Sequence, residues 1–428
     1  MKGPVVISNG YGRFHLRLAA AEAARRGRLA AYITAAYPTA RLSAFARTRF
    51  AHLRPIARLL SREDNVPADR VHAQWAAEPF HHLDNEARRL PGIGNHLGEA
   101  LQLAGRALYT CGAARVIAAL PKVAGRGVYH YRAGFGLGSL AVARRRGWVL
   151  LCDHSIAHPA VLDHLVASGG KLPAPGLRGV MTPTWRQVEQ DIDAADHVLV
   201  NSDFVADTFA HLGWDRTRLD VIWLGIDAGF LAAIPARGVT GEGPLALLFA
   251  GAFGRRKGAD VLMAALATLD DVDWRLDVCG PIEPDLAGAA ARLRDDRRVT
   301  FHGIVPAADL ARHMASAEVF VFPSLAEGSA RVVFEALAAG CFVITTVNAG
   351  SIVVDGVHGA IVPPADPVAL GAALRAAAAD RRRIAAVGRS NAALVRHDYS
   401  QEAYGDSLAA LYDRLIDIRM HRTNGHGG

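Results

Sequence analysis

Short apolar runs alternate along the chain with segments of helical length. The runs are rich in β-branched and aromatic residues, which is typical of strands buried on both faces. They lie at Pro4–Ser8, Gly127–Arg132, Trp148–Cys152, His197–Asn201, Asp220–Leu224, Leu245–Ala250, Trp274–Cys279, Val299–Gly303 and Val319–Phe322. Because most of them are separated by segments of helical length, the pattern predicts an α/β protein with parallel sheets and crossover helices.

The stretch that follows the last of these runs shows the repeating unit most clearly. After Val319–Phe322 comes a glycine-bearing loop, and from Ala330 apolar residues recur at helical spacing until Gly340, which is placed as a helix stop. A further strand is predicted at Cys341–Thr346. The loop therefore lies where the amide groups of a helix N-terminus point outward, which is a ready site for an anion.

Two carboxylates, Glu327 and Glu335, belong to this unit. A carboxylate repels phosphate but accepts hydrogen bonds from hydroxyl groups, so the pair beside an anion site indicates a ligand that carries both groups. A nucleotide sugar does so, because it offers a diphosphate to the amides and ribose and hexose hydroxyls to the two acids. The alternative is a solvated helix start, where Glu is favoured without any ligand.

A second loop of the same kind follows the strand predicted at Leu245–Ala250. It begins at Gly251, contains the consecutive cations Arg255, Arg256 and Lys257, and leads into a predicted helix. The three cations can neutralise a diphosphate, although the residue order of a P-loop is absent. In a parallel sheet both loops lie at the carboxyl ends of strands, where open α/β sheets bind ligands.

Length and composition place the chain among multidomain globular proteins. Its 428 residues predict two or three domains, and a 51% apolar share is ample for buried cores. The four cysteines form no Cys-x-x-Cys pair, so we expect neither a disulfide framework nor a cysteine zinc site, and a reducing cytoplasm suits the chain. We find neither a signal peptide nor an apolar stretch long enough to span a membrane.

The net charge of +7 is unevenly distributed, since residues 1–150 carry 23 basic and 8 acidic side chains. Within this part, the segment Arg41–Arg62 has arginines between apolar residues, a basic amphipathic pattern suited to an anionic membrane surface or an anionic acceptor. No nucleic-acid-binding motif accompanies it, so nucleic acid is not an expected partner. The alternative is an arginine-rich, solvated helix.

Residues from about 196 to 370 resemble the nucleotide-sugar-binding domain of GT-B glycosyltransferases, in particular the retaining family four, the group 1 transferases. The stretches that carry the resemblance are VLVNSDF, VIWLGID, FAGAFGRRKGADVLMAAL, FHGIVP, VFVFPSLAEGSARVVFEALAAGCFVITT and DGVHGAIVPPADP. Over the first half only topology, Gly10-Tyr11-Gly12 and a strand-end histidine are similar. The resemblance implies two Rossmann-like domains that face each other across a cleft.

The resemblance also implies roles for single residues. Glu335 is expected to bind ribose hydroxyls, while Glu327 and Lys257 are expected to act in catalysis, on the transferred sugar and the diphosphate. The family's partner arginine is replaced here by Ala252, and Arg255 or Arg256 is the expected substitute. The other donor-binding candidates are Gly10, Gly12, Gly251, Gly328, Ser329 and Ala330.

In the first half, the segment Cys152–Pro159 (CDHSIAHP) follows a predicted strand. It resembles the strand-end histidine that the family places near the anomeric carbon, which makes His154 the predicted catalytic histidine and His158 the reserve. Asp153 either orients that imidazole or caps the turn. The alternative for a lone histidine is a purely structural role.

The predicted domains are an acceptor-binding domain at residues 1–235 and a donor-binding domain at 236–399. The boundary is placed in the Pro- and Gly-rich segment Pro235–Pro244. Helices at about 400–420 are expected to cross back onto the first domain, and residues 421–428 are predicted to be a disordered tail.

The expected reaction is retaining transfer from a nucleotide-sugar donor to a lipid-linked or polysaccharide acceptor in cell-envelope or exopolysaccharide biosynthesis. The expected location is the cytoplasm, with peripheral association at the inner face of the plasma membrane. No cofactor is expected. No metal ion is expected either, because the cations of the loop can neutralise the diphosphate in its place. Two Asp-x-Asp triplets, at 191–193 and 271–273, are expected to be solvated.

Other functions remain open at this point. Gly134, Gly136 and Gly138 after a predicted strand, with Asp153 further on, partly match a dinucleotide-binding fingerprint and thus an NAD(P)-dependent oxidoreductase. A GT-B sugar-nucleotide epimerase is a second alternative. The third is a degenerate glycosyltransferase that binds a sugar nucleotide without turnover, a hypothesis motivated by Ala252.

Overall fold

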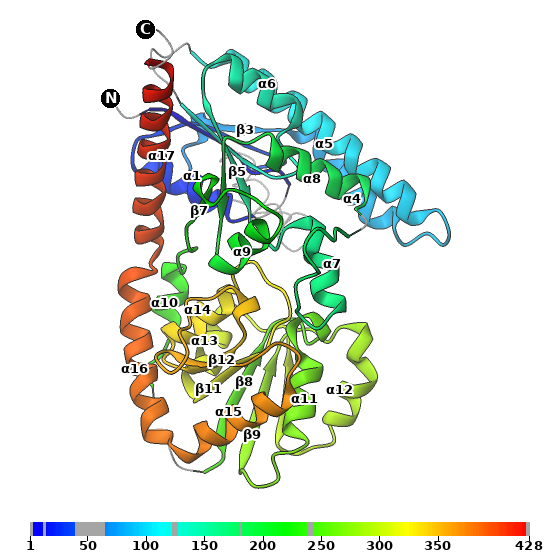
Figure 1. Cartoon of the computed structure of the whole chain (residues 1–428), viewed down its shortest axis with the longest axis vertical. Coiled ribbons are helices and arrows are strands. Elements are labelled where there is room, and N and C mark those ends of the chain that lie inside the picture. The colour runs from blue at the N-terminus through cyan, green and yellow to red at the C-terminus, as the bar shows by residue number, and fades with distance from the viewer. Residues whose placement is uncertain are drawn as a thin grey trace, which may run out of the picture.

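The computed structural model describes residues 3–11, 14–38, 65–121, 127–179, 181–237 and 243–424. Its strands form two parallel sheets in two lobes, which Figure 1 shows one above the other. The predicted α/β architecture of two Rossmann-like domains is therefore confirmed. Gly12 and the basic segment Arg41–Arg62 lie outside the described residues.

The first sheet has seven parallel strands within the described residues, in the order β3-β2-β1-β4-β5-β6-β7. They are β1 (Val5–Ser8), β2 (Leu29–Thr34), β3 (Val71–Ala73), β4 (Val128–Arg132), β5 (Val149–His154), β6 (His197–Val200) and β7 (Leu219–Val221). The helices of this domain are α1 (Leu16–Arg25), α4 (Glu78–Ala87), α5 (Gly94–Ala119), α6 (Leu137–Arg145), α7 (Pro159–Ala167), α8 (Pro183–Asp193) and α9 (Asp203–His211). Apolar residues of α5, α6, α8 and α9 pack on one face of the sheet, and those of α1 on the other.

The second sheet has six parallel strands within the described residues, in the order β10-β9-β8-β11-β12-β13. They are β8 (Leu245–Ala250), β9 (Trp274–Cys279), β10 (Val299–Gly303), β11 (Val319–Phe322), β12 (Phe342–Thr345) and β13 (Gly359–Ile361). Its helices are α11 (Ala259–Leu266), α12 (Ala287–Leu293), α13 (Ala307–Ser316), α14 (Arg331–Ala338), α15 (Pro367–Ala379) and α16 (Arg381–Asp398). Gly340 follows the end of α14 with φ of +81°, as a helix stop requires.

The chain passes between the two domains at two adjacent points. On the way out it leaves β7 and enters α10 (Ala228–Ala233), whose Phe230 belongs to the core of the second domain. On the way back it passes Ser400, which pairs with Ile226. The crossing therefore lies before Pro235–Pro244, where the sequence suggested the boundary, because Pro and Gly mark surface loops inside a domain as well as linkers.

Helix α17 (Gln401–Asn424) packs on the first domain after this return crossing. In Figure 1, α16 and α17 run one after the other along the side of both lobes. The buried face of α17 completes the core on the α1 side of the first sheet, and its members are Tyr404, Leu408, Leu411, Tyr412 and Leu415. Polar contacts join them, since the Tyr412 hydroxyl lies 2.8 Å from Nδ1 of His130 on β4.

The prediction of a disordered tail at 421–428 is wrong for its first part, because α17 continues to Asn424. Once a helix is nucleated and packed, each further residue adds a backbone hydrogen bond at little extra cost, so a packed helix is readily extended at its end. Residues 425–428 lie outside the described residues.

Replacing Leu411 by Ala should show how firmly α17 is held by the first domain. The Leu411 side chain is almost fully buried, so the change should lower the free energy of unfolding by about 3 kcal/mol through lost burial and a residual cavity. Urea unfolding measures it. Asp417→Ala on the exposed face of the same helix is the control and should change stability by less than about 0.5 kcal/mol. If both variants lose the same free energy of unfolding, the apolar face of α17 does not hold the helix on the first domain.

Candidate functional site

The two glycine-bearing loops of the second domain touch each other. Gly258 precedes α11 with φ of +73°, and a Cβ atom there would lie 2.0 Å from the carbonyl oxygen of Pro323. The backbone amide of Leu325 donates to the carbonyl of Arg256 at 2.9 Å, and the Ser324 hydroxyl donates to the same oxygen at 3.0 Å. The loops after β8 and β11 therefore form one rigid surface at the carboxyl ends of adjacent strands.

Two cations and one acid from these loops form a compact cluster. The Lys257 Nζ and Arg256 Nη1 atoms each lie 2.6 Å from Oε1 of Glu327, and the Ser324 hydroxyl donates to the same oxygen at 3.1 Å. Burial lowers the pKa of Lys257, and the charge of Glu327 opposes that shift. Arg255 instead points outward, with its nearest carboxylate on Asp285 at 3.8 Å. Of the two arginines proposed to replace the cation missing at Ala252, the structure brings only Arg256 to the cluster.

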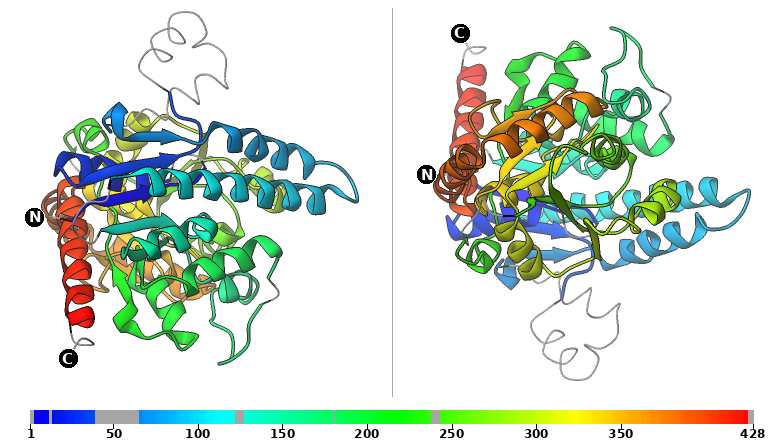
Figure 2. Two further views of the ribbon diagram at one scale, coloured as in Figure 1. Left: turned by 90° about the horizontal axis from the view of Figure 1, so that it is seen from above. Right: turned by 90° about the horizontal axis from the view of Figure 1, so that it is seen from below.

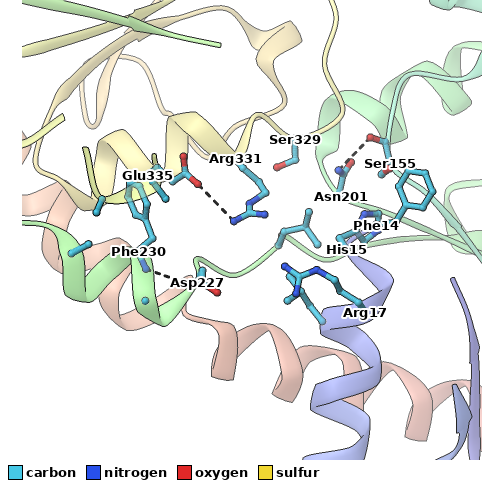
Figure 3. A pocket seen from close by; sticks show the side chains of 16 residues that line it. Phe14, His15, Arg17, Ser155, Asn201, Asp227, Phe230, Ser329, Arg331 and Glu335 are labelled. Carbon is cyan, nitrogen blue, oxygen red and sulfur yellow. Dashed lines mark hydrogen bonds and ion pairs between the residues drawn. The ribbon is translucent and has the colours of Figure 1, made fainter. Parts of the chain in front are cut away.

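A cavity of about 840 Å³ lies between the two domains. We call it the cleft cavity, and Figure 3 shows it from close by. Its first-domain wall is polar in part, with Phe14, His15, Arg17, Leu18, Ser155 and Asn201. Leu224, Asp227 and Phe230 line it from the crossing segment, and Ser329, Arg331 and Glu335 line it from the second domain.

A second cavity of about 410 Å³ lies against the second sheet, and we call it the sheet-edge cavity. It is bounded by the ends of β8 and β9, by the start of α13 and by α14. Its lining is mostly apolar or glycine, with Ala250, Gly251, Cys279, Gly280, Pro281, Ile304, Val305, Leu310 and Val332. Such a shallow, apolar wall suits a flat ring system.

Glu335 and Arg331 line both cavities. They belong to the first two turns of α14, and Arg331 Nη2 lies 3.7 Å from Glu335 Oε1. Burial raises the pKa of Glu335, and the charge of Asp227 adds to that effect while Arg331 opposes it. In Figure 3 the Arg331 side chain extends into the cavity beside Glu335. A ligand that occupied both cavities would pass directly over the Glu335 carboxylate.

The loop that carries the other predicted residues is held by the first domain. A Cβ atom on Gly328 would lie 1.7 Å from the carbonyl oxygen of Ser155, so only glycine fits there. The Ser202 hydroxyl donates to the Gly328 carbonyl. Next to it, the buried hydroxyl oxygen of Ser329 lines the cleft cavity and has no hydrogen-bond partner within the described part of the chain, which leaves it available to a ligand. Ala330 directly precedes α14.

The histidine at the cleft cavity is His15, whereas the sequence predicted His154. His154 ends β5, but its imidazole is buried against Phe209 and is not among the residues that line the cavity. Burial lowers the pKa of His154 to about 4, so the ring is neutral at pH 7. The reserve, His158, is also buried and caps α7 by accepting from the amide of Ala160.

His15 lies just before α1, and its Nε2 atom is 2.7 Å from Oδ1 of Asp153 on β5. Burial alone would raise the pKa of Asp153, but the charges and hydrogen bonds of His15 and His130 hold it well below its usual range. Asp153 thus orients an imidazole, as the sequence suggested, although a different one. His15 follows the glycine loop after β1, so the rule that loops at strand ends bind ligands would have found it.

Two glycines predicted to bind the donor have clear backbone roles. Gly10, with φ of +76°, packs under the ring of Phe135, which a Cβ atom would meet at 2.7 Å. Gly251, with φ of +130°, lines the sheet-edge cavity, and a Cβ atom on it would lie 4.0 Å from Cε of Lys257. Lys257 itself is not among the residues that line either cavity; it lies beside Gly251.

The partial dinucleotide fingerprint is explained by a buried carboxylate. Asp191 accepts hydrogen bonds of 2.7 Å from the amides of Gly136 and Leu137, at the N-terminus of α6 where a pyrophosphate would have to bind. The prediction that this Asp-x-Asp triplet is solvated is therefore wrong for Asp191, which is fully buried. Its burial raises its pKa to about 6. The amide groups that an NAD(P) cofactor needs are already occupied.

Comparison with known proteins agrees with this geometry. Residues 244–380 match the family described as glycosyl transferases group 1. A D-inositol 3-phosphate glycosyltransferase of Pseudarthrobacter chlorophenolicus is 31% identical over 238 residues, which are 50% of this chain and 55% of that protein. A protein of the same name from Streptomyces avermitilis is 28% identical over 70% of this chain and 67% of its own length. The chain thus spans about half to two thirds of these relatives.

Among solved structures, the Anabaena protein HepE, in complex with UDP and glucose, has the same fold. The TM-score is 0.60 at 15% identity, and the match covers 96% of this chain and 99% of that chain. The arrangement of two facing parallel-sheet domains is the GT-B fold, as the sequence predicted.

Replacing Glu327 by Ala should test whether its cluster stabilises the two loops. The change leaves two neighbouring cations without their counter-charge in a largely buried place, so we expect a loss of about 2 kcal/mol, with thermal unfolding as the measurement. Asp271→Ala is the matched control, because its partner Arg375 is at the surface and such pairs contribute little. If both variants unfold at the same temperature, the cluster does not hold the loops.

Proposed function

We propose that this chain, which has the GT-B fold and matches the group 1 glycosyltransferases over residues 244–380, passes a sugar from a nucleotide-sugar donor to an acceptor in the cleft cavity, with retention of anomeric configuration. The observation that carries the proposal is the position of Glu335, which lines both the cleft cavity and the sheet-edge cavity. A donor is elongated and amphiphilic, with a flat base at one end and a sugar at the other, and the two cavities, which share Arg331 and Glu335, suit both ends.

The base would lie in the sheet-edge cavity, against Pro281 and Val305. The ribose hydroxyls would then face the Glu335 carboxylate, which is an acceptor for both. The diphosphate would pass Gly251 towards the start of α14, and the transferred sugar would reach Ser329 and the cleft cavity. HepE was solved with UDP and glucose, which supports a uridine nucleotide as donor.

Leaving-group stabilisation is the main catalytic effect that the residues supply. Departure of a nucleoside diphosphate develops negative charge, which Arg256, Lys257 and the amide groups of α14 can stabilise more in the transition state than in the ground state. The Lys257–Glu327 pair fixes these cations before any donor arrives, so little reorganisation is needed. We therefore propose a reaction that needs neither a metal ion nor a cofactor.

The acidic groups of the cleft support retention without an enzyme-bound intermediate. Among the described residues that line the cleft cavity, the carboxylates are those of Asp227 and Glu335. Asp227 caps α10 by accepting from the amide of Phe230 at 3.1 Å, and Glu335 is assigned to the ribose. Neither is placed as a nucleophile. His15, oriented by Asp153, lies at the acceptor side of the cavity and is the residue we propose to contact the reacting hydroxyl.

The acceptor would bind to the first-domain wall, where His15, Ser155, Asn201 and Arg17 supply polar groups. We propose a hydroxyl-rich acceptor in cell-envelope or exopolysaccharide biosynthesis, lipid-linked or saccharide. The positive charge of Arg17 also suits a phosphorylated polyol, the kind of acceptor that the names of the two relatives give. Measuring the release of UDP in the presence of each acceptor class distinguishes these acceptors. If no acceptor class leads to release of UDP, a protein that binds the donor without turnover is favoured.

Glu335→Gln should weaken binding of UDP by about 10- to 100-fold, because a hydrogen bond to a charged acceptor contributes about 1.5–3 kcal/mol. Calorimetric titration with UDP measures it, and Asp271→Asn at the surface is the control. Since the pKa of Glu335 is raised, the affinity of the unaltered protein should fall with decreasing pH already above the usual Glu value of about 4.3, and that fall should be absent in Glu335→Gln. Unchanged UDP affinity in the variant would remove the ribose assignment.

We also propose that the enzyme works in the cytoplasm at an anionic membrane surface. No described helix is long and apolar enough to cross a bilayer. Instead, the α4–α5 hairpin projects from the body of the first domain, as Figure 2 shows. Leu90, Ile93 and Leu97 at its turn are exposed by 49%, 65% and 40%, and Arg88 and Arg89 precede them. Apolar side chains flanked by cations are typical of segments that insert into an anionic interface.

The double change Leu90→Glu and Ile93→Glu should abolish sedimentation of the protein with vesicles that contain anionic phospholipid, since it adds charge where apolar side chains would insert. Val368→Glu, at an exposed apolar position of α15, is the matched control and should leave sedimentation unchanged. Raising the salt concentration should weaken the interaction of the unaltered protein. Equal sedimentation of the double variant and the control would exclude the hairpin as the membrane contact.

A further inference from the structure

Three potential metal ligands meet at the β10 edge of the second sheet. Asp277 on β9, His302 on β10 and His313 on α13 each offer one ligand atom, and these atoms lie within 4.8 Å of one another. We propose that they form a binding site for a divalent cation of the zinc class. None of the three is among the residues that line the cleft cavity or the sheet-edge cavity, so the inference does not depend on the transfer reaction.

The fold itself brings the three side chains together. Thr300 on β10 is the register partner of Asp277, and the register shifts between Phe301 and Gly303, so His302 lies at an irregular position of the strand from which it contacts Asp277. Helix α13 follows β10 and places His313 beside His302. Nε2 of His302 lies 2.6 Å from Oδ1 of Asp277, and the centroids of the two imidazole rings are 4.2 Å apart.

The donor set selects the metal. Two imidazole nitrogens and one carboxylate oxygen suit zinc, whereas magnesium and calcium prefer oxygen ligands alone. Zinc bonds of about 2.0–2.2 Å place tetrahedral donors about 3.4 Å apart, so small rotations of the side chains are enough to close the site. Both His302 and Asp277 are about one quarter exposed, so water can supply the remaining ligand.

The surroundings of the ligands prepare them for a cation. The other oxygen of Asp277, Oδ2, lies 3.1 Å from Nη1 of Arg275, which fixes the carboxylate and leaves Oδ1 turned towards the histidines. Asp309, one turn earlier on α13, adds negative charge and is itself paired with Arg312.

The site has a structural consequence for the neighbouring sheet-edge cavity. Ile304 and Val305 follow His302 closely in the chain, and Leu310 precedes His313 by one turn of α13; all three line that cavity. A cation that joins β9, β10 and α13 would hold this wall in place. Zinc should therefore raise the temperature of thermal unfolding, because it binds the folded chain, in which the three ligands lie close together, and not the unfolded chain.

Calorimetric titration of the full chain tests the site, with the protein free of any histidine tag and freed of metal by chelation. We expect saturable binding of one zinc ion, no binding of magnesium at the same concentration, and a loss of zinc affinity of about 10-fold or more in both His302→Gln and His313→Gln. His397→Gln is the matched control. His397 also contacts a carboxylate, on Asp398, but lacks a second histidine, so its loss should leave zinc affinity unchanged.

A second measurement on the unaltered protein does not rely on the variants. Cobalt(II) bound by two nitrogens and one oxygen in a tetrahedral site gives strong visible absorption, and zinc should displace it in an equimolar amount. Absence of saturable zinc binding by the unaltered chain, or equal zinc affinity in His302→Gln, His313→Gln and His397→Gln, would overturn the proposal.

Discussion

The loop between β11 and α14 is the constraint on which the rest of the site depends. It is held from two sides, because Pro323 and Leu325 contact the 251–258 loop while Gly328 lies against Ser155 and Ser202 of the first domain. Ala326 is fully buried in a small apolar cluster with Val161 and Leu165, residues of α7. The polar side chains of this loop therefore have positions set by both domains, and the cavities exist because the loop cannot collapse into them.

The charges of the site follow from this clamp. The backbone amide of Glu327 donates to the Asn348 carbonyl, and its carboxylate lies within hydrogen-bonding distance of Arg256 and Lys257, so three charges meet at this loop. The cluster carries one net positive charge and is largely buried, which makes it attractive to an anion and costly to leave half-paired. Arg256 brings its cation to this cluster, and its backbone carbonyl accepts hydrogen bonds from Leu325 and Ser324. The backbone contacts of Arg256 thus hold its side chain near Glu327.

The sequence predicted what depends on local pattern and missed what depends on packing. The strand-loop-helix unit around Glu327 and Glu335 was readable, because apolar periodicity and Gly340 define its elements within a short stretch. The orientation of His154 could not be predicted, since the direction of a side chain at a strand end depends on its neighbours in space, here Phe209 of α9. The burial of Asp191 was hidden for the same reason: its partners, the amides at the start of α6, lie far away in the chain. His15 could have been predicted, because it follows a loop at a strand end. Arg331 could not, because an exposed arginine on a helix carries no signal of its own in the sequence.

The position of the two chain crossings limits how the cleft can open. Ile226 and Ser400 pair with each other, and a Cβ atom on Gly225 would lie 2.5 Å from the Ser400 carbonyl, so both crossings form one tight strand-like junction. The contacts of Gly328 with Ser155 and of Asn348 with the Gly170 carbonyl, at 2.7 Å, are further links between the domains. Any rotation about the junction must break these polar contacts and expose the Ala326 cluster. Entry of a donor along the sheet-edge cavity requires no such rotation, because that cavity is built from the second domain alone. In the proposed reaction the nucleotide would therefore bind first, and the first domain would complete the cleft cavity around the sugar.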